Sequence, residues 1–169
     1  IKAQEAIQAA VGLASRNGQQ VIEPLHLLAG VMEKGKDVVN YLFQKSGISL
    51  QIVENAVKSE IAHLPKVSGG EPYFSNDANK VMQTTMDESQ KMGDEFVSIE
   101  PLLLALLSVN STASRILKDA GCTEQVLKTA IKELRQGEKV QTQSGDENYQ
   151  ALSKYARNLV EDARAGKLD

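Results

Sequence analysis

VIEPLHLLAGV (residues 21–31) and SIEPLLLALLS (residues 98–108) repeat one pattern, Ile-Glu-Pro-Leu-x-Leu, 77 residues apart in the chain. Pro24 and Pro101 suit the first turn of an α-helix, where a missing backbone N–H breaks no hydrogen bond. The leucines that follow each proline are typical of a helix that faces a core. We therefore predict that each stretch begins a helix and that the two helices hold equivalent places in the fold.

The similarity between the two halves of the chain extends beyond this pattern. With an offset of 74 residues, the second half repeats these residues of the first: Gly47, Gln51, Ala56 and Lys58 match Gly121, Gln125, Ala130 and Lys132. Such a match indicates an internal duplication of a four-helix unit. Because two copies are too few for a solenoid, we predict an all-α fold with pseudo-two-fold symmetry. Its eight helices form two four-helix repeats, and each repeat covers the apolar face of the other.

Apolar residues at helical spacing, interrupted by glycine and proline, define the extent of each repeat. We predict a domain over residues 1–136, with repeat one at 1–64, an inter-repeat loop at 65–75 and repeat two at 76–136. The predicted breaks between helices contain glycine: Asn17-Gly18, Gly35, Ser46-Gly47, Met92-Gly93 and Ala120-Gly121.

The chain changes character after residue 136. Residues 137–146 are polar and contain glycine, which predicts a flexible linker. Residues 147–169 have apolar residues at helical spacing and are predicted to form a last, C-terminal linker helix. We expect its apolar face to pack on a domain that is not included in this chain.

The composition excludes several classes of partner. Nineteen basic and 22 acidic residues are interspersed and give a net charge of −3, so no electrostatic signal favours nucleic-acid binding. No apolar run is as long as a membrane span, and we expect no membrane association. A single cysteine cannot form an internal disulfide and suits a reducing compartment, which predicts a cytoplasmic protein. The eight helices show no oligomerisation stripe, which predicts a monomeric fragment.

No group of residues has the spacing of a catalytic or metal site. Residues 30–37 (GVMEKGKD) resemble a phosphate-binding loop, but Asp37 stands where a Mg²⁺-binding Ser or Thr is needed, so we predict a helix end and loop. His26 and His63 lack ligands at metal-binding spacing, and a lone helical histidine is more often structural. Cys122 has no basic residue near it in sequence, which favours a buried or incidental thiol. We predict no catalytic activity, metal or cofactor for this chain itself.

Glu23 and Glu100 each precede a proline and therefore lie at a helix N-terminus. One interpretation is a stabilising interaction with the helix dipole, worth about 0.3–1 kcal/mol. The other is a pair of symmetry-related acids beside surface grooves, able to hold cationic or amide groups of a peptide. Asp94 and Glu95 precede the second acid and would add acceptors there, so the second groove is the more acidic of the two.

The sequence resembles a known family at several of these places. Two Glu-Pro-Leu-x-Leu motifs, the Ser46-Gly47 and Ala120-Gly121 breaks and the tract LPKVSGGEPYFS (residues 64–75) resemble the N-terminal Clp repeat domain. Residues 128–169 resemble the stretch that joins this domain to the first ATPase module of the AAA+ protein disaggregases. The resemblance covers essentially the whole chain.

This resemblance implies a role in a larger machine. The full protein would be a homohexameric ring ATPase of the stress response, with ATP and Mg²⁺ in the missing ATPase domains, that works with the DnaK chaperone system. The chain itself would bind unfolded or aggregated polypeptides and deliver them to the ring. The alternative is an adaptor-docking or phosphoarginine-reading N-terminal domain of a protease-linked Clp ATPase.

The resemblance also implies a binding site. In the family, substrate contact is attributed to a groove with apolar walls and acidic rims. The matching positions here are Asp94, Glu100 and Pro101, with Thr84 and Glu88 on the preceding helix. Thr84 and Glu88 depart from the family, in which relatives can carry leucines there, so this groove is expected to be more polar. In repeat one the counterpart of Glu100 is Glu23, which completes the predicted substrate-binding residues.

Overall fold

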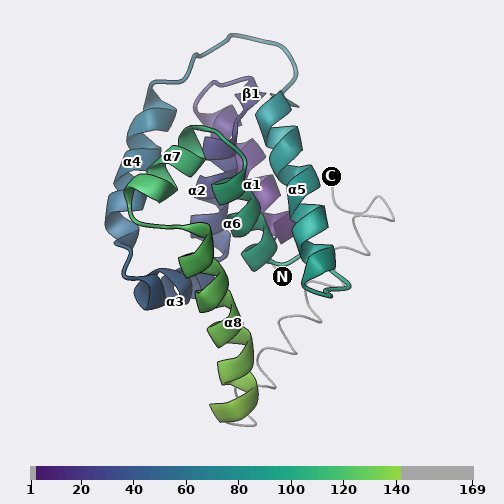
Figure 1. Cartoon of the computed structure of the whole chain (residues 1–169). Helices are drawn as coiled ribbons and strands as arrows, with labels where there is room; N and C mark the ends of the chain where they lie inside the picture. Colours follow the sequence, from purple (N-terminus) through teal and green to yellow (C-terminus); the bar gives the residue numbers. More distant parts are fainter. Residues whose placement is uncertain (1–2, 142–169) are drawn as a thin grey trace.

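A computed structural model describes residues 3–141 and confirms an all-α fold, in which the described residues form eight helices and two very short strands (Figure 1). The elements in chain order are α1 (Ala3–Arg16), β1 (Val21–Ile22), α2 (Pro24–Lys34), α3 (Lys36–Ser46), α4 (Leu50–Ala62), β2 (Tyr73–Phe74), α5 (Asn76–Lys91), α6 (Ile99–Ser108), α7 (Thr112–Asp119) and α8 (Glu124–Gln141). The predicted helix over 147–169 lies outside the described residues.

Most of the helices begin and end where glycine, proline and capping residues in the sequence predict. Gly47 and Gly121, the matched breaks of the two repeats, have positive φ angles of 70° and 96°. This left-handed conformation favours glycine, because a Cβ would strain the backbone. The hydroxyl of Ser75 accepts a hydrogen bond of 3.0 Å from the backbone N–H of Ala78 and so caps α5.

Helix α8 is longer than the sequence predicts. Residues 137–141, predicted as the start of a flexible linker, continue the helix to Gln141. Four of these five residues are not helix breakers, and a single glycine inside a helix costs only about 1 kcal/mol relative to alanine. The glycine at 137 therefore does not end the helix, while the domain boundaries themselves stay predictions.

The two Glu-Pro motifs begin their helices differently. Glu23 is extended (φ −102°, ψ 165°) and Pro24 is the first residue of α2. In the second copy, α6 already begins at Ile99, so Glu100 and Pro101 lie inside its first turn. The residues directly before Glu23 belong to β1, whereas no strand precedes α6 directly among the described residues.

The parallel pairing of β1 with β2 was not predicted from the sequence. Val21 pairs with Tyr73 and Ile22 with Phe74. A further backbone hydrogen bond of 2.9 Å runs from the N–H of Val67 to the carbonyl of Gly18. The inter-repeat loop is therefore hydrogen-bonded to the connection between α1 and α2 at several points along its length.

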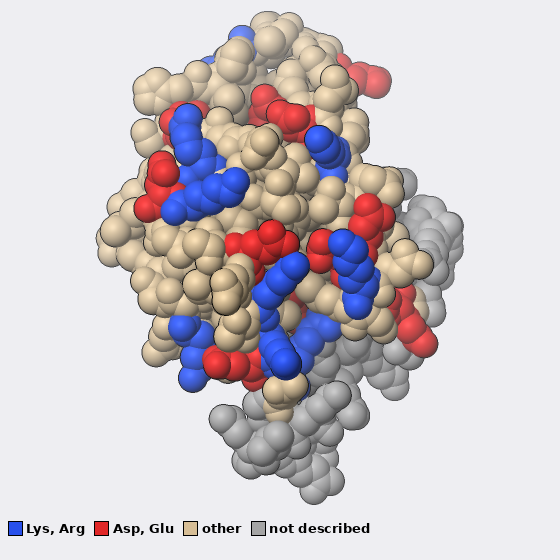
Figure 2. Space-filling model, in the orientation of Figure 1, with Lys and Arg blue, Asp and Glu red and all other residues tan. Residues whose placement is uncertain are grey.

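Charged side chains of both signs are mixed on the surface. Figure 2 shows Lys and Arg side chains beside Asp and Glu side chains over the visible face, with uncharged residues between them. This distribution agrees with the interspersed charges and small net charge of the sequence.

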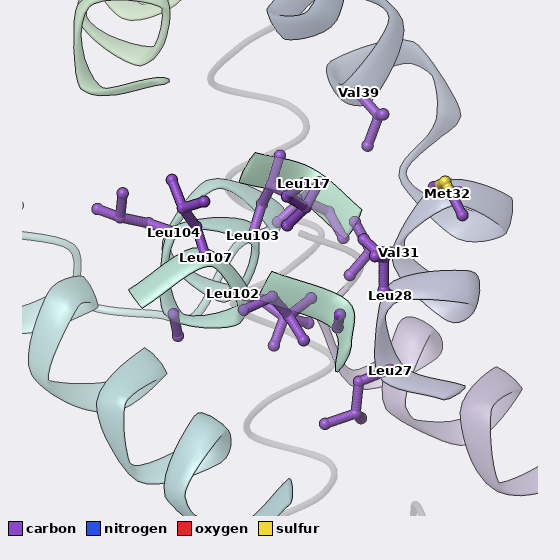
Figure 3. Packing of buried hydrophobic residues seen from close by; sticks show 14 of the residues in the cluster. Leu27, Leu28, Val31, Met32, Val39, Leu102, Leu103, Leu104, Leu107 and Leu117 are labelled. Atoms are coloured by element: carbon purple, nitrogen blue, oxygen red, sulfur yellow. The ribbon is translucent and has the colours of Figure 1, made fainter. Parts of the chain in front are cut away.

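Helices α2 and α6 form the centre of the core. Figure 3 shows leucines of α6 directed toward Leu28 and Val31 of α2, with Leu117 of α7 beside them. Every residue of α6 from Ile99 to Leu107 is buried. The other helices pack around this pair: α1 on α2, α5 on α6, α3 on α8 and α4 on α7. The last two contacts join the repeats, so the eight helices share one core. None of the described helices is both long and apolar enough to cross a membrane.

The contact between α1 and α2 is unusually close. The buried face of α1 consists of alanines, namely Ala3, Ala6, Ala10 and Ala14. Gly30 of α2 lies against them, and a Cβ at Gly30 would overlap the carbonyl oxygen of Ala6. In repeat two the residue that matches Gly30 is the much larger Leu107, which is buried on α6. The two repeats therefore share a fold but differ in the size of the residue at this position of their second helices.

Candidate functional site

Two of the predicted acidic residues lie together in repeat two, and they share a partner that the sequence did not reveal. Arg135 of α8 forms two hydrogen bonds with Asp94, at 2.8 Å from Nη1 to Oδ1 and 2.9 Å from Nη2 to Oδ2. Its Nη2 also lies 3.4 Å from Oε1 of Glu100. Asp94, Glu100 and Arg135 are called the Arg135 cluster below.

Three separate elements bring these side chains together. Asp94 follows the C-terminal end of α5, where Gly93 turns the chain with a φ of 73°. Glu100 lies in the first turn of α6, and Arg135 lies on α8, which packs against α6. The Nη2 atom of Arg135 also lies 3.5 Å from the hydroxyl of Ser98, the residue before α6. The cluster therefore links α8 to the connection between α5 and α6.

The Arg135 cluster is only partly open to solvent. The side chains of Arg135 and Asp94 are each 18% exposed, and that of Glu100 is 5% exposed. A bidentate contact between a guanidinium and a carboxylate is among the stronger hydrogen-bonded pairs in proteins. With two carboxylates and one guanidinium, the cluster carries one more negative than positive charge. Its chemistry favours a second cation, or hydrogen-bond donors, over anions.

A signal for Arg135 was present in the sequence alignment of the two repeats. With the same offset of 74 residues, Arg135 corresponds to Ile61 of α4. Ile61 is buried in the core, so the duplicated position carries an apolar residue in one repeat and a cation in the other. A cation on the inward face of a helix needs an acidic partner. Comparing the repeats by side-chain type would therefore have suggested a partner for the acids.

The other predicted residues of repeat two lie on α5 and α6. Thr84 and Glu88 are both half-buried on α5 and share one helix face at a spacing of four residues. Glu88 forms an ion pair of 3.5 Å with Lys91. Pro101 is buried in the first turn of α6. Their roles in substrate binding stay predictions.

Glu23 lies in a separate hollow and not with the Arg135 cluster. The hollow is lined by residues from the start of α2, the end of α4 and the starts of α5 and α7: Glu23, Pro24, Leu25, Leu64, Asp77, Ser111 and Thr112. Among residues 3–136, no cation forms an ion pair with Glu23. The two symmetry-related acids therefore have different surroundings. Glu100 lies beside an internal guanidinium, whereas Glu23 lies beside Asp77 and two hydroxyls.

His26 belongs to a buried hydrogen-bond network behind Glu23. Its Nδ1 accepts a hydrogen bond of 2.9 Å from the backbone N–H of Glu23, and its Nε2 lies 2.7 Å from Oε1 of Gln19. The side-chain amide of Gln19 in turn donates to the carbonyl of Ile61 at 2.6 Å. Burial lowers the pKa of His26 to about 4. The ring is therefore neutral near pH 7. Through Gln19, the network joins the start of α2 to the carbonyl of Ile61 on α4.

The remaining candidates have structural surroundings. Cys122 is buried, as predicted, and burial raises the pKa of its thiol to about 11. Residues 30–37 contain the end of α2, Gly35 and the start of α3, so the predicted helix end and loop is confirmed. In the part of the chain that the structure describes, no three His, Cys, Asp or Glu residues are grouped as metal ligands.

The sequence is similar to a known domain family and to chaperone proteins of two bacteria. Residues 1–120 match the Clp repeat (R) N-terminal domain. The whole chain is 59% identical to chaperone protein ClpB of Bacteroides thetaiotaomicron and 51% identical to that of Porphyromonas gingivalis. In both comparisons the chain spans 20% of the relative's length.

Solved structures show the same architecture. The Hsp104 N-terminal domain from Candida albicans is 26% identical, with a TM-score of 0.70 over 79% of this chain and 88% of that one. The N-terminal domain of the caseinolytic protease associated chaperone ClpD from Arabidopsis thaliana is 25% identical, with a TM-score of 0.58 over 76% of this chain and 88% of that one.

Proposed function

The chain belongs to the Clp repeat N-terminal domain family, and on this premise we propose that it is the substrate-engaging domain of an ATP-dependent chaperone that disaggregates stress-denatured proteins. In this proposal the domain binds unfolded or aggregated polypeptide and delivers it to a hexameric ring. The ATP and Mg²⁺ sites belong to ATPase domains outside this chain, and the DnaK system acts with the full protein in the cytoplasm. The high identity to ClpB chaperones supports the proposal.

The observation that carries the binding proposal is the grouping of Asp94 and Glu100 at one partly open point of repeat two. Their carboxylates outnumber the guanidinium beside them, and they can accept hydrogen bonds from basic side chains or backbone amides of an extended polypeptide. Thr84, Glu88 and Pro101 complete the proposed site. Weak binding is expected, because an unfolded polypeptide loses conformational freedom when it is held.

A second candidate function rests on Glu23. This carboxylate lines a hollow and has no ion-pair partner within residues 3–136, so a guanidinium group could take that place. Such a site suits adaptor docking or phosphoarginine reading in a protease-linked Clp ATPase. The similarity to the ClpD domain is compatible with this alternative, whereas the more similar ClpB sequences favour the first.

Binding of a permanently unfolded protein, such as reduced and carboxymethylated α-lactalbumin, tests these proposals. We expect backbone amide chemical shifts to change around Asp94 and Glu100 during the titration, and Asp94→Asn to weaken binding. Glu23→Gln serves as the matched variant in the other repeat. Shift changes confined to the Glu23 hollow would favour the second function, and the absence of shift changes at both acids would refute both.

Stability must be measured for each variant in the same experiment. Asp94 and Glu100 also pair with Arg135, so their replacement changes the packing of α8 as well as the site. If the binding of a variant falls only in proportion to the fraction of its molecules that are unfolded, the replaced carboxylate has a structural role and does not contact the substrate. Loss of binding in a fully folded Asp94→Asn variant supports a direct contact.

A further inference from the structure

We propose that Arg135 is an internal ligand of the acidic site, which a basic side chain of the bound polypeptide displaces, and that this displacement releases the C-terminal part of α8. The inference rests on the proposed function, since it assigns both a ligand chemistry and a regulation to the same site.

The geometry of Arg135 is that of a bound ligand. Its guanidinium forms a two-point contact with Asp94 and reaches Glu100 and Ser98 with the same Nη2 atom. An arginine from another chain would make the same contacts with the same acids. Because the side chains of Arg135 and Asp94 keep 18% of their surface exposed, a second cation can approach them from solvent.

The burial of Glu100 determines which ligand can replace Arg135. The Glu100 side chain is 5% exposed, and a buried carboxylate that loses its cation is strongly destabilised. Departure of Arg135 therefore requires another positive group at the same place. An arginine or lysine side chain satisfies this requirement, whereas a purely apolar segment does not.

The position of Arg135 on α8 connects the site to the rest of the chain. Among residues 124–136 of α8, the buried residues are Leu127, Ala130, Ile131 and Leu134. Arg135 follows directly after the last of them, and α8 continues to Gln141 away from the other helices (Figure 1). The ion pairs with Asp94 and Glu100 thus hold the helix near the point where it leaves the body of the molecule. Once they are exchanged, this end of α8 is free to fray or tilt.

Repeat one provides an internal comparison. The residue that corresponds to Arg135 is the buried Ile61, so α4 supplies no cation to Glu23. A basic side chain that enters the Glu23 hollow has no internal guanidinium to displace. Binding there is expected to leave α8 unchanged.

The test uses the full chain and an unstructured peptide that contains two arginines, with a second peptide that carries uncharged citrulline at those positions. In the wild type, we expect the arginine peptide to accelerate amide hydrogen exchange in residues 135–141, and the citrulline peptide to leave it unchanged. In Arg135→Gln, which lacks the competitor, we expect the arginine peptide to bind about tenfold more tightly. Arg115→Gln is the matched control, because it removes the exposed ion pair with Glu60 and leaves the cluster intact.

The outcomes separate this inference from the proposed function. Equal affinity of the wild type and Arg135→Gln for the arginine peptide, with unchanged exchange in α8, would overturn the role of Arg135 while leaving substrate binding in place. No binding of either the peptide or an unfolded protein by the wild type would overturn both. If Arg135→Gln does not fold, the exchange measurement on the wild type decides alone.

Discussion

Lowering the pH should destabilise this fold through one residue, His26. Its ring lies in the core, with Nδ1 accepting the backbone N–H of Glu23. A nitrogen that accepts this hydrogen bond carries no proton, so Nε2 carries it and donates to Gln19. Protonation of Nδ1 would place two N–H groups against each other and bury a charge, which agrees with the lowering of the pKa from 6.5 to about 4.

The sign and size of the effect follow from this shift. Between pH 6.5 and about 4 the unfolded chain binds a proton at His26 that the folded chain excludes, so the free energy of unfolding falls as the pH is lowered. Each pKa unit corresponds to about 1.4 kcal/mol, which sets an upper bound of about 3 kcal/mol for the complete loss. Above pH 6.5 the contribution is constant, because His26 is neutral in both states.

Urea unfolding followed by circular dichroism between pH 7.5 and 4.5 measures this loss. His26→Gln keeps a side chain that can accept the N–H of Glu23 but does not titrate. We expect wild type to lose about 2–3 kcal/mol more than this variant over the range. His63→Gln, at an exposed position, should behave like wild type. Equal pH dependence in wild type and His26→Gln, or a His26 ring that titrates near pH 6.5 by NMR, would refute the reasoning.

Two further predictions concern packing and reactivity. Gly30→Ala should lower the free energy of unfolding by about 1–3 kcal/mol, because its Cβ meets the backbone of Ala6 rather than a flexible side chain. Gly12→Ala, whose Cβ meets only the end of Arg16, should raise it by up to about 1 kcal/mol; similar urea midpoints for both variants would contradict this contrast. Cys122 should react with a thiol reagent such as DTNB only after denaturant is added, and rapid labelling of the native chain would show that it is accessible.

The helical architecture was predictable because its signals are local. Proline at Pro24 and glycine at Gly47 and Gly121 act on their own turns of the chain, and the apolar spacing within each helix shows which face is buried. The match between the two halves of the sequence then predicted the pseudo-two-fold symmetry of the fold. Each of these inferences uses residues that are near each other or repeated at a constant offset.

The features that the sequence did not predict depend on distant residues. Two residues on each side form the β1–β2 pair, too few for any alternation to be visible, and they lie about fifty positions apart. The Arg135 cluster joins residues 41 positions apart, and nothing near Asp94 in sequence indicates which cation it meets. The acids were identified from the Glu-Pro pattern and the residues before it, and the family resemblance supported them, but their contact with Arg135 depends on where α8 packs.

The shared core of α2 and α6 has a consequence for how such a fold arose. A single repeat on its own would expose the leucines with which these two helices cover each other. Two unlinked copies could bury them against each other as a symmetric homodimer, the commonest closed assembly of identical chains. Gene fusion through residues 65–75 then replaces a concentration-dependent association with an intramolecular one, at an effective concentration in the millimolar range for a short linker. Once the copies were fused, their sequences could diverge independently. The equivalent positions 61 and 135, which carry isoleucine and arginine, are an example of such divergence.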